Sequence, residues 1–312
     1  MSDLAKPLTV KNDLLFKKVF GSPRYAHILV GFLNDILQLD IEEVTIENPY
    51  DIAIFRQEFA QNKVFHTEVD LVARLQDQTL VTIELQINPQ LFYRERSLYY
   101  LSQKYISNYG RSGIIRLQEH QSGAKYSSLY PAYGLNILDF NLFPDDLAVL
   151  RHFTLYERDL KQVFLGVEEQ PLFTLSFFEL QKQPDKKLRK QVQYWLNYFN
   201  KGTVDQEAPA YLQEAVEVIK DQNLEEEEKM IVDALEKARE DYKGALQYAE
   251  IKGLEQGLEQ GLEQGREEGL EQGLEQGKAE TVKQFLAVGM DWELIMQATG
   301  LTKEQLLKLA EE

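Results

Sequence analysis

The first chemistry that the sequence offers is a pair of acids in two stretches rich in β-branched residues. Asp70 lies in EVDLVARL, and Glu84 lies with Gln86 in VTIELQI. Residues two apart on a strand point to the same face, so Glu84 and Gln86 share a face and the apolar residues that alternate with them take the other. If the two stretches pair as a hairpin whose register brings Asp70 opposite Glu84, their Cβ atoms come within about 5 Å.

Two carboxylates at that distance repel each other unless a cation lies between them. Oxygen ligands of this kind suit Mg²⁺, with Mn²⁺ as an alternative, and both ions bind phosphate oxygens readily. A bound metal ion lowers the pKa of a water ligand and neutralises charge on a phosphodiester under in-line attack, and Gln86 could orient that water. Taken alone, the spacing favours a simpler interpretation, an ordinary strand pair with a polar outer face.

A cationic stretch directly follows the two acids. Residues 87–125 contain six basic residues against two acidic ones. The first part of this stretch has the pattern of a helix with one face formed by Arg96, Tyr99, Tyr100 and Gln103. Arginine on this face can bind phosphate by charge-assisted hydrogen bonds, and tyrosine can stack or donate a hydrogen bond. In the alternative interpretation, the tyrosines are core residues and the arginines extend past them to solvent.

The elements that would position these residues follow from changes in periodicity. Helical spacing of apolar residues covers 12–20, 25–39, 89–108 and 186–198, and strand-like stretches cover 51–59, 65–75, 80–87, 133–140, 151–158 and 172–180. The polar residues from Gln76 to Thr79 predict the turn between two of these strands. Helices and strands in this order predict a mixed α/β layer fold.

Composition narrows the class of protein. The 312 residues are 44% hydrophobic and include no cysteine, which excludes disulfides, thiolate zinc sites and cysteine nucleophiles. No apolar run approaches the roughly 18 residues of a membrane span, and the N-terminus lacks a signal-peptide pattern, so we expect no membrane partner and a cytoplasmic location. The absence of GxxxxGK, GxGxxG and GxSxG motifs argues against a nucleotide cofactor and against serine hydrolysis. The four histidines have no metal-ligand spacing, although His66 lies four residues before Asp70.

The net charge of −17 is distributed unevenly along the chain. Residues 1–200 contain 22 Lys and Arg against 24 Asp and Glu, whereas residues 201–312 contain 12 against 27. The acidity therefore belongs to the C-terminal third, and the nearly neutral first part can carry a local basic face for DNA.

The C-terminal part is predicted to be helical and contains an internal repeat, GLEQGLEQGLEQGREEGLEQGLEQG, from Gly253 to Gly277. Glycine costs about 1 kcal/mol relative to alanine inside a helix, so this repeat is unfavourable unless a partner helix approaches closely. A period of four predicts a right-handed supercoil, with the parallel leucines as the apolar seam. We expect a homo-oligomer through this helix, the alternative being a solvated single helix. Residues 281–312 favour a plain helical hairpin over a DNA-binding helix-turn-helix.

Several motifs together resemble one family. The pattern DxnExQ formed by Asp70, Glu84 and Gln86 is followed by FYRERSLYYLSQKY and YPAYGLNILDFNLF, and NDLLFKKVFG and FLNDIL precede it. This combination over residues 10–180, with the glycine-repeat tail, is similar to the Rpn family of recombination-promoting nucleases, also described as PD-(D/E)xK transposases. The resemblance implies a restriction-endonuclease-like core that cleaves DNA with Mg²⁺, and it carries over Asp70 and Glu84 as metal ligands. Gln86 stands where the wider superfamily has lysine, and Lys104 is a candidate replacement for that charge.

We therefore predict an α/β, restriction-endonuclease-like mixed-sheet domain at residues 1–200, a helical extension at 201–280 and a small helical unit at 281–312. The predicted function is Mg²⁺-dependent hydrolysis of DNA phosphodiester bonds, which could promote recombination. The predicted metal ligands are Asp70, Glu84 and the Leu85 carbonyl, and Gln86 orients the attacking water. Residues expected to support the site or bind phosphate are Arg96, Tyr99 and Gln103. The alternative is a non-catalytic, oligomerising scaffold with the same fold, and a strand-joining transposase is less favoured because no third acid has the expected spacing.

Overall fold

The computed structural model describes residues 8–60, 71–118, 121–144, 147–184 and 187–311. The chain forms two compact units, Met1–Lys237 and Ala238–Glu312. In the described part of the chain, no helix combines the length and the apolar character that crossing a membrane requires.

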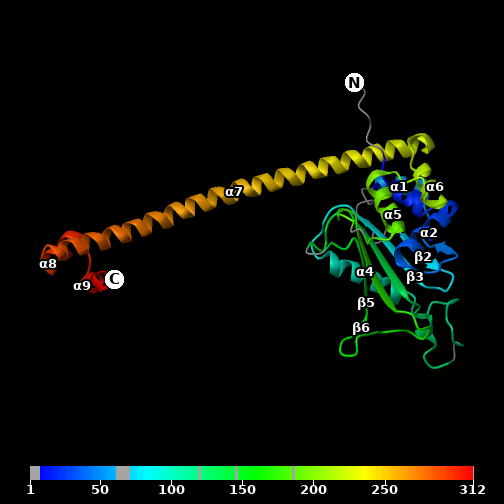
Figure 1. The fold of residues 1–312 in the computed structure, drawn as a ribbon, viewed down its shortest axis with the longest axis horizontal. Helices are drawn as coiled ribbons and strands as arrows, with labels where there is room; N and C mark the ends of the chain where they lie inside the picture. Colours follow the sequence, from blue (N-terminus) through cyan, green and yellow to red (C-terminus); the bar gives the residue numbers. More distant parts are fainter. Residues whose placement is uncertain (1–7, 61–70, 119–120, 145–146, 185–186, 312) are drawn as a thin grey trace, which may run out of the picture. The chain divides into compact units, whose positions relative to one another are not determined.

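A mixed sheet forms the centre of the first unit (Figure 1). Within the described residues its strand order is β1-β2-β3-β4-β8-β5. The strands are β1 (Val44–Ile46), β2 (Leu71–Leu75), β3 (Leu80–Gln86), β4 (Ala132–Leu138), β5 (Leu150–Thr154) and β8 (Phe173–Glu179). The pairs β1–β2, β2–β3 and β5–β8 are antiparallel, whereas β3–β4 and β4–β8 are parallel. This mixed sheet with its helices confirms the predicted fold class.

Helices cover both faces of the sheet (Figure 1). One face carries α1 (Asp13–Phe20), α2 (Ala26–Leu37), α5 (Lys190–Lys201) and α6 (Ala210–Val218). The β3 residues that join the core on this face are Val81, Ile83 and Leu85. The opposite face carries α4 (Tyr93–Ser107), whose Leu101 packs in a second cluster with Leu80 and Ala132. The central strands are therefore buried on both sides, as parallel pairing requires.

The main core is dense in aromatic rings. Phe32 contacts Trp195 edge to face, with ring centroids 4.7 Å apart, and Phe20 stacks on Phe199 at 6.0 Å. The indole Nε1 of Trp195 donates a hydrogen bond to Asp35 at 2.7 Å, so the buried donor is satisfied. These contacts join α1, α2 and α5 into one layer that supports β3 from behind.

Shorter elements connect the main ones. They are the helix α3 (Ile52–Ala60), the 3₁₀ helices η1 (Pro23–Tyr25), η3 (Ala124–Ser128) and η4 (Asp221–Asn223), and a small hairpin of β6 (Tyr156–Glu157) and β7 (Gln162–Val163). The predicted turn between β2 and β3 is confirmed, because the Leu75 amide donates to the Thr79 carbonyl at 3.0 Å.

The predicted strand at residues 51–59 is wrong, because this stretch forms α3. The Asp51 carboxylate accepts hydrogen bonds from the amides of Ala53 and Ile54 at 2.8 and 3.2 Å and so caps the first turn of a helix. Phe55 is then buried against the core. The first strand of the sheet is instead β1, whose three residues are too few to give a periodic signal.

The long helix α7 extends from Glu226 to Ala287 and contains the whole glycine repeat. The second unit ends in α8 (Trp292–Thr299) and α9 (Lys303–Glu311). Val282, Ile295 and Leu306 form its small core. Gly289 and Gly300 have positive φ angles of 79° and 68° and lie where the helices of this unit are interrupted.

Candidate active site at the carboxyl end of strand β3

Glu84 lies near the carboxyl end of β3, on the face that α4 covers. Its register partner on the parallel strand β4 is Asn136. Glu84 is 9% exposed and Asn136 is 3% exposed, so the acid is nearly closed off from bulk water. Because β3 and β4 are parallel, their carboxyl ends open at the same edge of the sheet, where loops build binding sites in α/β proteins.

A polar network surrounds this acid. The Tyr93 hydroxyl donates to Asn136 Oδ1 at 3.0 Å and lies 3.4 Å from Glu84 Oε2. The Asn136 amide donates in turn to the Ser176 carbonyl at 3.2 Å. Tyr93 is the first residue of α4 and is only 1% exposed. The network therefore fixes the surroundings of Glu84 by joining β3, β4, β8 and α4.

Tyr93 and Asn136 are not among the site residues predicted from the sequence. Tyr93 belongs to FYRERS, where it is one aromatic residue among several in an amphipathic helix. A usable signal did exist in YGLNIL, because an amide inside an otherwise apolar buried strand needs a hydrogen-bond partner. Which partner it finds depends on how α4 crosses the sheet.

The other end of α4 is fixed to β2. Arg74 donates to Asn108 at 3.1 Å and forms an ion pair with Glu47 at 2.7 Å. Burial raises the pKa of Glu47, but the hydrogen bonds and charges of Arg74 and Arg111 outweigh it and hold this pKa below its ordinary value. The helix is thus anchored at both ends, so its first turn is held over Glu84.

Gln86 is half-buried and lies one pleat beyond Glu84 on the same face of β3. Its side-chain NH₂ group donates to the Asn88 carbonyl at 2.9 Å. This bond holds the loop that leads from β3 into α4. One amide hydrogen is therefore used within the chain, and any contact of Gln86 with an attacking water uses the remaining hydrogen or the amide oxygen.

The predicted phosphate-binding residues lie on one flank of α4. Arg94 reaches the opposite flank, where it donates to the Leu142 carbonyl at 2.9 Å and covers the ring of Phe143. Phe143 in turn packs on Phe177 of β8. Arg96 is two residues, about 200°, further around the helix, so its flank faces the β2 side. Arg96 covers the ring of Tyr100 at 5.1 Å and donates to Gln90.

The distance of each residue from the site follows from the helix rise of 1.5 Å per residue. Counted from Tyr93, Arg96 lies about 4.5 Å along the axis, Tyr99 about 9 Å and Gln103 about 15 Å. Tyr99 is 61% exposed and Gln103 is exposed. Of the three residues, Arg96 therefore lies nearest along the axis to Tyr93, which contacts Glu84, whereas Tyr99 and Gln103 suit contacts with a longer ligand. Lys104, about 16 Å along the axis, lies too far to replace a lysine at position 86.

The remaining predicted residues are divided between the core and the part of the chain that the structure leaves undescribed. Leu85 points to the face opposite Glu84 and is 7% exposed in the main core, so only its backbone carbonyl could serve as a ligand. Asp70 and His66 lie outside the described residues. No cluster of three or more potential metal-ligating side chains occurs among the described residues.

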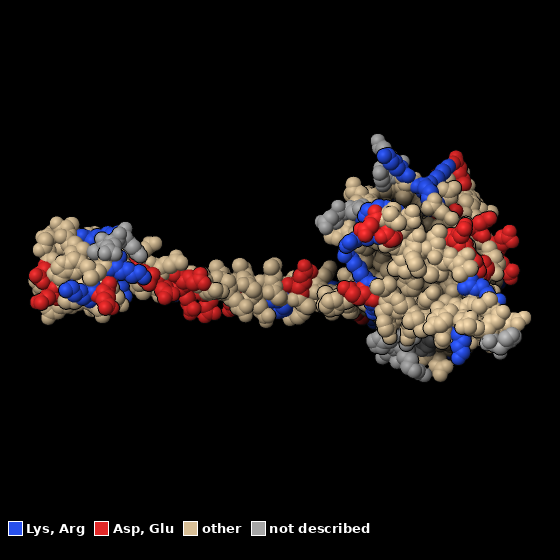
Figure 2. Space-filling model, turned by 90° about the horizontal axis from the view of Figure 1, so that it is seen from below, with Lys and Arg blue, Asp and Glu red and all other residues tan. Residues whose placement is uncertain are grey.

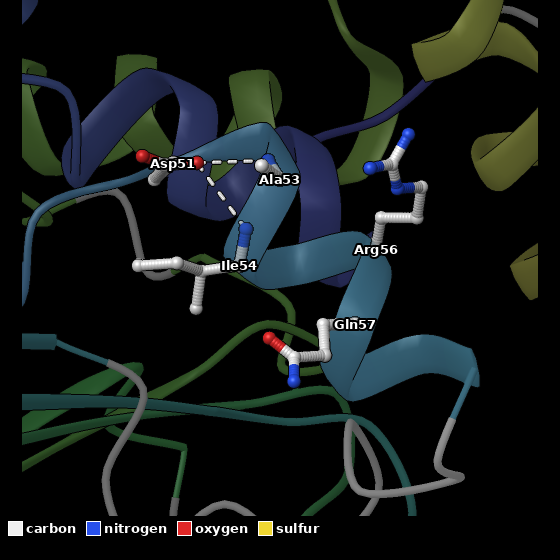
Figure 3. Close-up of a pocket in the computed structure, with 5 residues that line it drawn as sticks. All are labelled: Asp51, Ala53, Ile54, Arg56 and Gln57. Carbon is white, nitrogen blue, oxygen red and sulfur yellow. Dashed lines mark hydrogen bonds between the residues drawn. The ribbon is translucent and has the colours of Figure 1, made fainter.

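A surface hollow at α3 is lined by Asp51, Ala53, Ile54, Arg56 and Gln57. Figure 3 shows that the Asp51 carboxylate is directed to the amides of Ala53 and Ile54, while Arg56 points away from Gln57. Arg56 forms an ion pair with Glu227 at 2.9 Å. Asp51, the one acid among the described residues that line this hollow, caps a helix, so we place the candidate site at the end of β3.

The comparisons with known proteins give one family match. A family model described as PD-(D/E)XK nuclease family transposase matches residues 10–249. The chain therefore belongs to this family, which confirms the predicted resemblance. Membership implies a nuclease- or transposase-type function with DNA as the substrate, and nucleases of this class generally use divalent metal ions. No curated protein and no solved structure matches the chain.

Proposed function

We propose that this chain is a divalent-metal-dependent DNA endonuclease whose active site lies at the carboxyl end of β3. The observation that carries the proposal is Glu84, an acid that is 9% exposed at a strand end and is held in a network with Tyr93 and Asn136. Burying a carboxylate is unfavourable unless charge or hydrogen bonds compensate for it. In a nuclease family, a metal ion and a phosphate are the reason to retain an acid there.

The donor set fits a hard cation. Glu84 and the Leu85 carbonyl offer oxygen ligands, which Mg²⁺ and Mn²⁺ prefer. We propose Asp70 as the second acid, because it directly precedes Leu71, whose partner in the antiparallel register is Ile83. When bound, such an ion supplies positive charge that favours ionisation of a water and neutralises the phosphodiester.

The chain's own residues would divide the remaining tasks. Gln86 shares a face with Glu84, which suits it to orient the attacking water. Tyr93 and Asn136 hold the carboxylate in place. Arg96 supplies a cationic group near the start of α4. Its buried Nε has no hydrogen-bond partner among the described residues. A phosphate oxygen is the acceptor that guanidinium groups prefer.

The test is plasmid cleavage with and without Mg²⁺, using Glu84→Gln and the matched control Glu95→Gln. Both variants remove one negative charge, but Glu95 is exposed in the first turn of α4. We expect Glu84→Gln to abolish metal-dependent cleavage while thermal unfolding stays at or above the wild-type temperature, and Glu95→Gln to cleave normally. Undiminished cleavage by Glu84→Gln would remove this residue from the proposal.

A non-catalytic scaffold is the second candidate, because Gln86 replaces the lysine of the wider superfamily. Thermal unfolding with added Mn²⁺ separates the two functions. A rise in Tm that disappears in Asp70→Ala supports the enzyme, whereas a wild-type protein that neither responds to Mn²⁺ nor cleaves DNA is the scaffold.

We also propose self-association through α7. Five leucines of its repeat are between 56% and 76% exposed: Leu254, Leu258, Leu262, Leu270 and Leu274. A Cβ atom added at any glycine of the repeat would meet nothing within 4 Å, so the chain itself gives these glycines no packing role. Figure 2 shows acidic side chains beside uncharged surface along this helix. A second copy of α7 is the partner that would contact both the exposed leucines and the glycines of the repeat.

We retain as a proposal the division into a nuclease-like domain at residues 1–200, an extension at 201–280 and a terminal unit at 281–312. A truncated protein for experiments should end at Lys237 rather than at residue 200, because the compact unit extends to Lys237. It keeps Glu228, whose carboxylate accepts hydrogen bonds from Lys18 at 2.5 Å and from Tyr50 at 2.9 Å.

A further inference from the structure

Phe92 has an unusual backbone and an unusual exposure. It is the N-cap residue of α4, and its φ of 58° and ψ of 30° lie in the left-handed region. Among the described residues, the other non-glycine positions with positive φ carry polar side chains: Gln38, Gln78, Lys161 and Glu169. The Phe92 side chain is 75% exposed, and that of Leu91 before it is 88% exposed.

Folding alone does not explain this choice of residue. Helix N-caps favour Ser, Thr, Asp or Asn, whose side chains accept a backbone hydrogen bond, and Phe92 makes no such bond. The left-handed conformation is strained for a residue with a Cβ atom, and glycine or asparagine would relieve it. An exposed ring gains nothing from burial either. Three local preferences are therefore violated at one position, a pattern that is typical of functional sites.

The position of Phe92 links it to the candidate site. It ends the loop between β3 and α4, and the next residue, Tyr93, contacts Glu84. The loop is held at its start by the bond from Gln86 to Asn88 and near its end by the bond from Arg96 to Gln90. The exposed ring thus belongs to a loop that is held near both ends and leads directly into Tyr93.

We propose that Phe92, with Leu91, is a wedge that stacks on an unpaired base beside the scissile phosphate. The favoured substrate is then DNA with locally unpaired bases, such as a bubble or a gap, rather than a continuous duplex. This inference rests on the proposed nuclease function and deepens it. Aromatic rings stack on bases of any sequence, and apolar side chains inserted at base steps stabilise distorted DNA.

The test measures binding without metal, so that it does not depend on cleavage. The probes are a continuous duplex and a duplex with a short bubble that contains 2-aminopurine, both in EDTA. We expect wild-type protein to prefer the bubble and to quench the 2-aminopurine by stacking. Phe92→Gly should lose roughly tenfold in affinity for the bubble and lose the quenching, with duplex affinity unchanged. Phe92→Trp should retain both.

Two further measurements keep the result interpretable. Phe92→Gly relieves the strained backbone, so its Tm should equal or exceed that of wild type, which excludes unfolding as the cause of weaker binding. Tyr156→Ala is the matched control, since Tyr156 is an aromatic residue in β6 that is 54% exposed, and its bubble binding should not change.

The inference is overturned if wild type binds bubble and duplex equally, or if Phe92→Gly binds and quenches as wild type does. Its failure is separate from that of the proposed function. A protein that cleaves with Mg²⁺ but shows no effect of Phe92→Gly loses only the wedge. A protein that binds the bubble through Phe92 but never cleaves keeps the wedge and loses the nuclease.

Discussion

Replacing Tyr93 with phenylalanine tests whether the network around Glu84 serves the site or only the fold. The change removes one hydroxyl and leaves Asn136 Oδ1, in a residue that is 3% exposed, without its donor at 3.0 Å. An unsatisfied buried acceptor costs about 1–3 kcal/mol, and the lost hydroxyl no longer needs desolvation, so we expect roughly 1–2 kcal/mol of destabilisation. For a unit of this size that lowers the Tm by about 2–8 °C.

The effect on the site is expected to be larger than the effect on stability. Groups that hold a metal ligand in place typically contribute about 10–100-fold to metal affinity. The contact from the Tyr93 hydroxyl to Glu84 is long, at 3.4 Å, so we expect the lower end, about tenfold weaker Mn²⁺ binding by calorimetry. Metal-dependent cleavage at subsaturating metal should fall in proportion, and excess metal should restore most of it.

Tyr198→Phe is the matched control for this experiment. The Tyr198 hydroxyl is also buried and donates to the Ala215 carbonyl at 2.9 Å, but it lies in the core between α5 and α6. Both variants should lose stability, and only Tyr93→Phe should lose metal affinity. If the two variants lose stability alike and bind Mn²⁺ as wild type does, the network is structural and the reasoning that links it to Glu84 is refuted.

Two other predictions concern DNA contact and assembly. Arg96→Ala should weaken DNA binding and reduce the slope of log affinity against log salt by about 0.9, because one phosphate contact is lost. Arg94→Ala, on the other flank of α4, should change this slope less. Equal slopes for both variants and the wild type would mean that the helix is purely structural. In the tail, replacing Gly257, Gly261, Gly265 and Gly269 with leucine should weaken self-association measured by light scattering, whereas alanine at the same positions should preserve it because a methyl group still permits close approach. A wild-type chain that is monomeric at tens of micromolar contradicts the assembly proposal.

Local patterns in the sequence predicted much of the fold. The strand-like stretches at 80–87 and 133–140 end within two residues of the bounds of β3 and β4, and the helical spacing at 12–20 agrees with α1. The failure at α3 has a local cause too, since Asp51 is a cap signal that competes with an alternating apolar run. Strand β1 is held by pairing with β2 rather than by its own three residues, so no local pattern could reveal it.

The same distinction between local patterns and contacts of distant residues applies to the candidate site. That Glu84 and Gln86 share a face follows from strand geometry, and that Arg96 and Tyr99 share a flank follows from helix geometry. The contact between Tyr93 and Asn136 joins residues far apart in the sequence, and it depends on the crossing of α4 over the sheet. The assignment of Asp70 as a metal ligand stays a prediction, because that residue lies outside the described part of the chain.

The glutamine at position 86 determines where positive charge must come from in the proposed reaction. A lysine there would place a cation beside the water, whereas an amide supplies only a dipole. Lys11 lies at this edge of the sheet, but it forms an ion pair with Asp139 at 2.6 Å, and Asp139 follows Leu138, whose side chain packs on the α4 face. The charge of Lys11 is therefore matched on the opposite face of the sheet. In the proposed site a bound metal ion and Arg96 would stabilise the phosphate, so loss of either should impair this chain more than it would a relative that has the lysine.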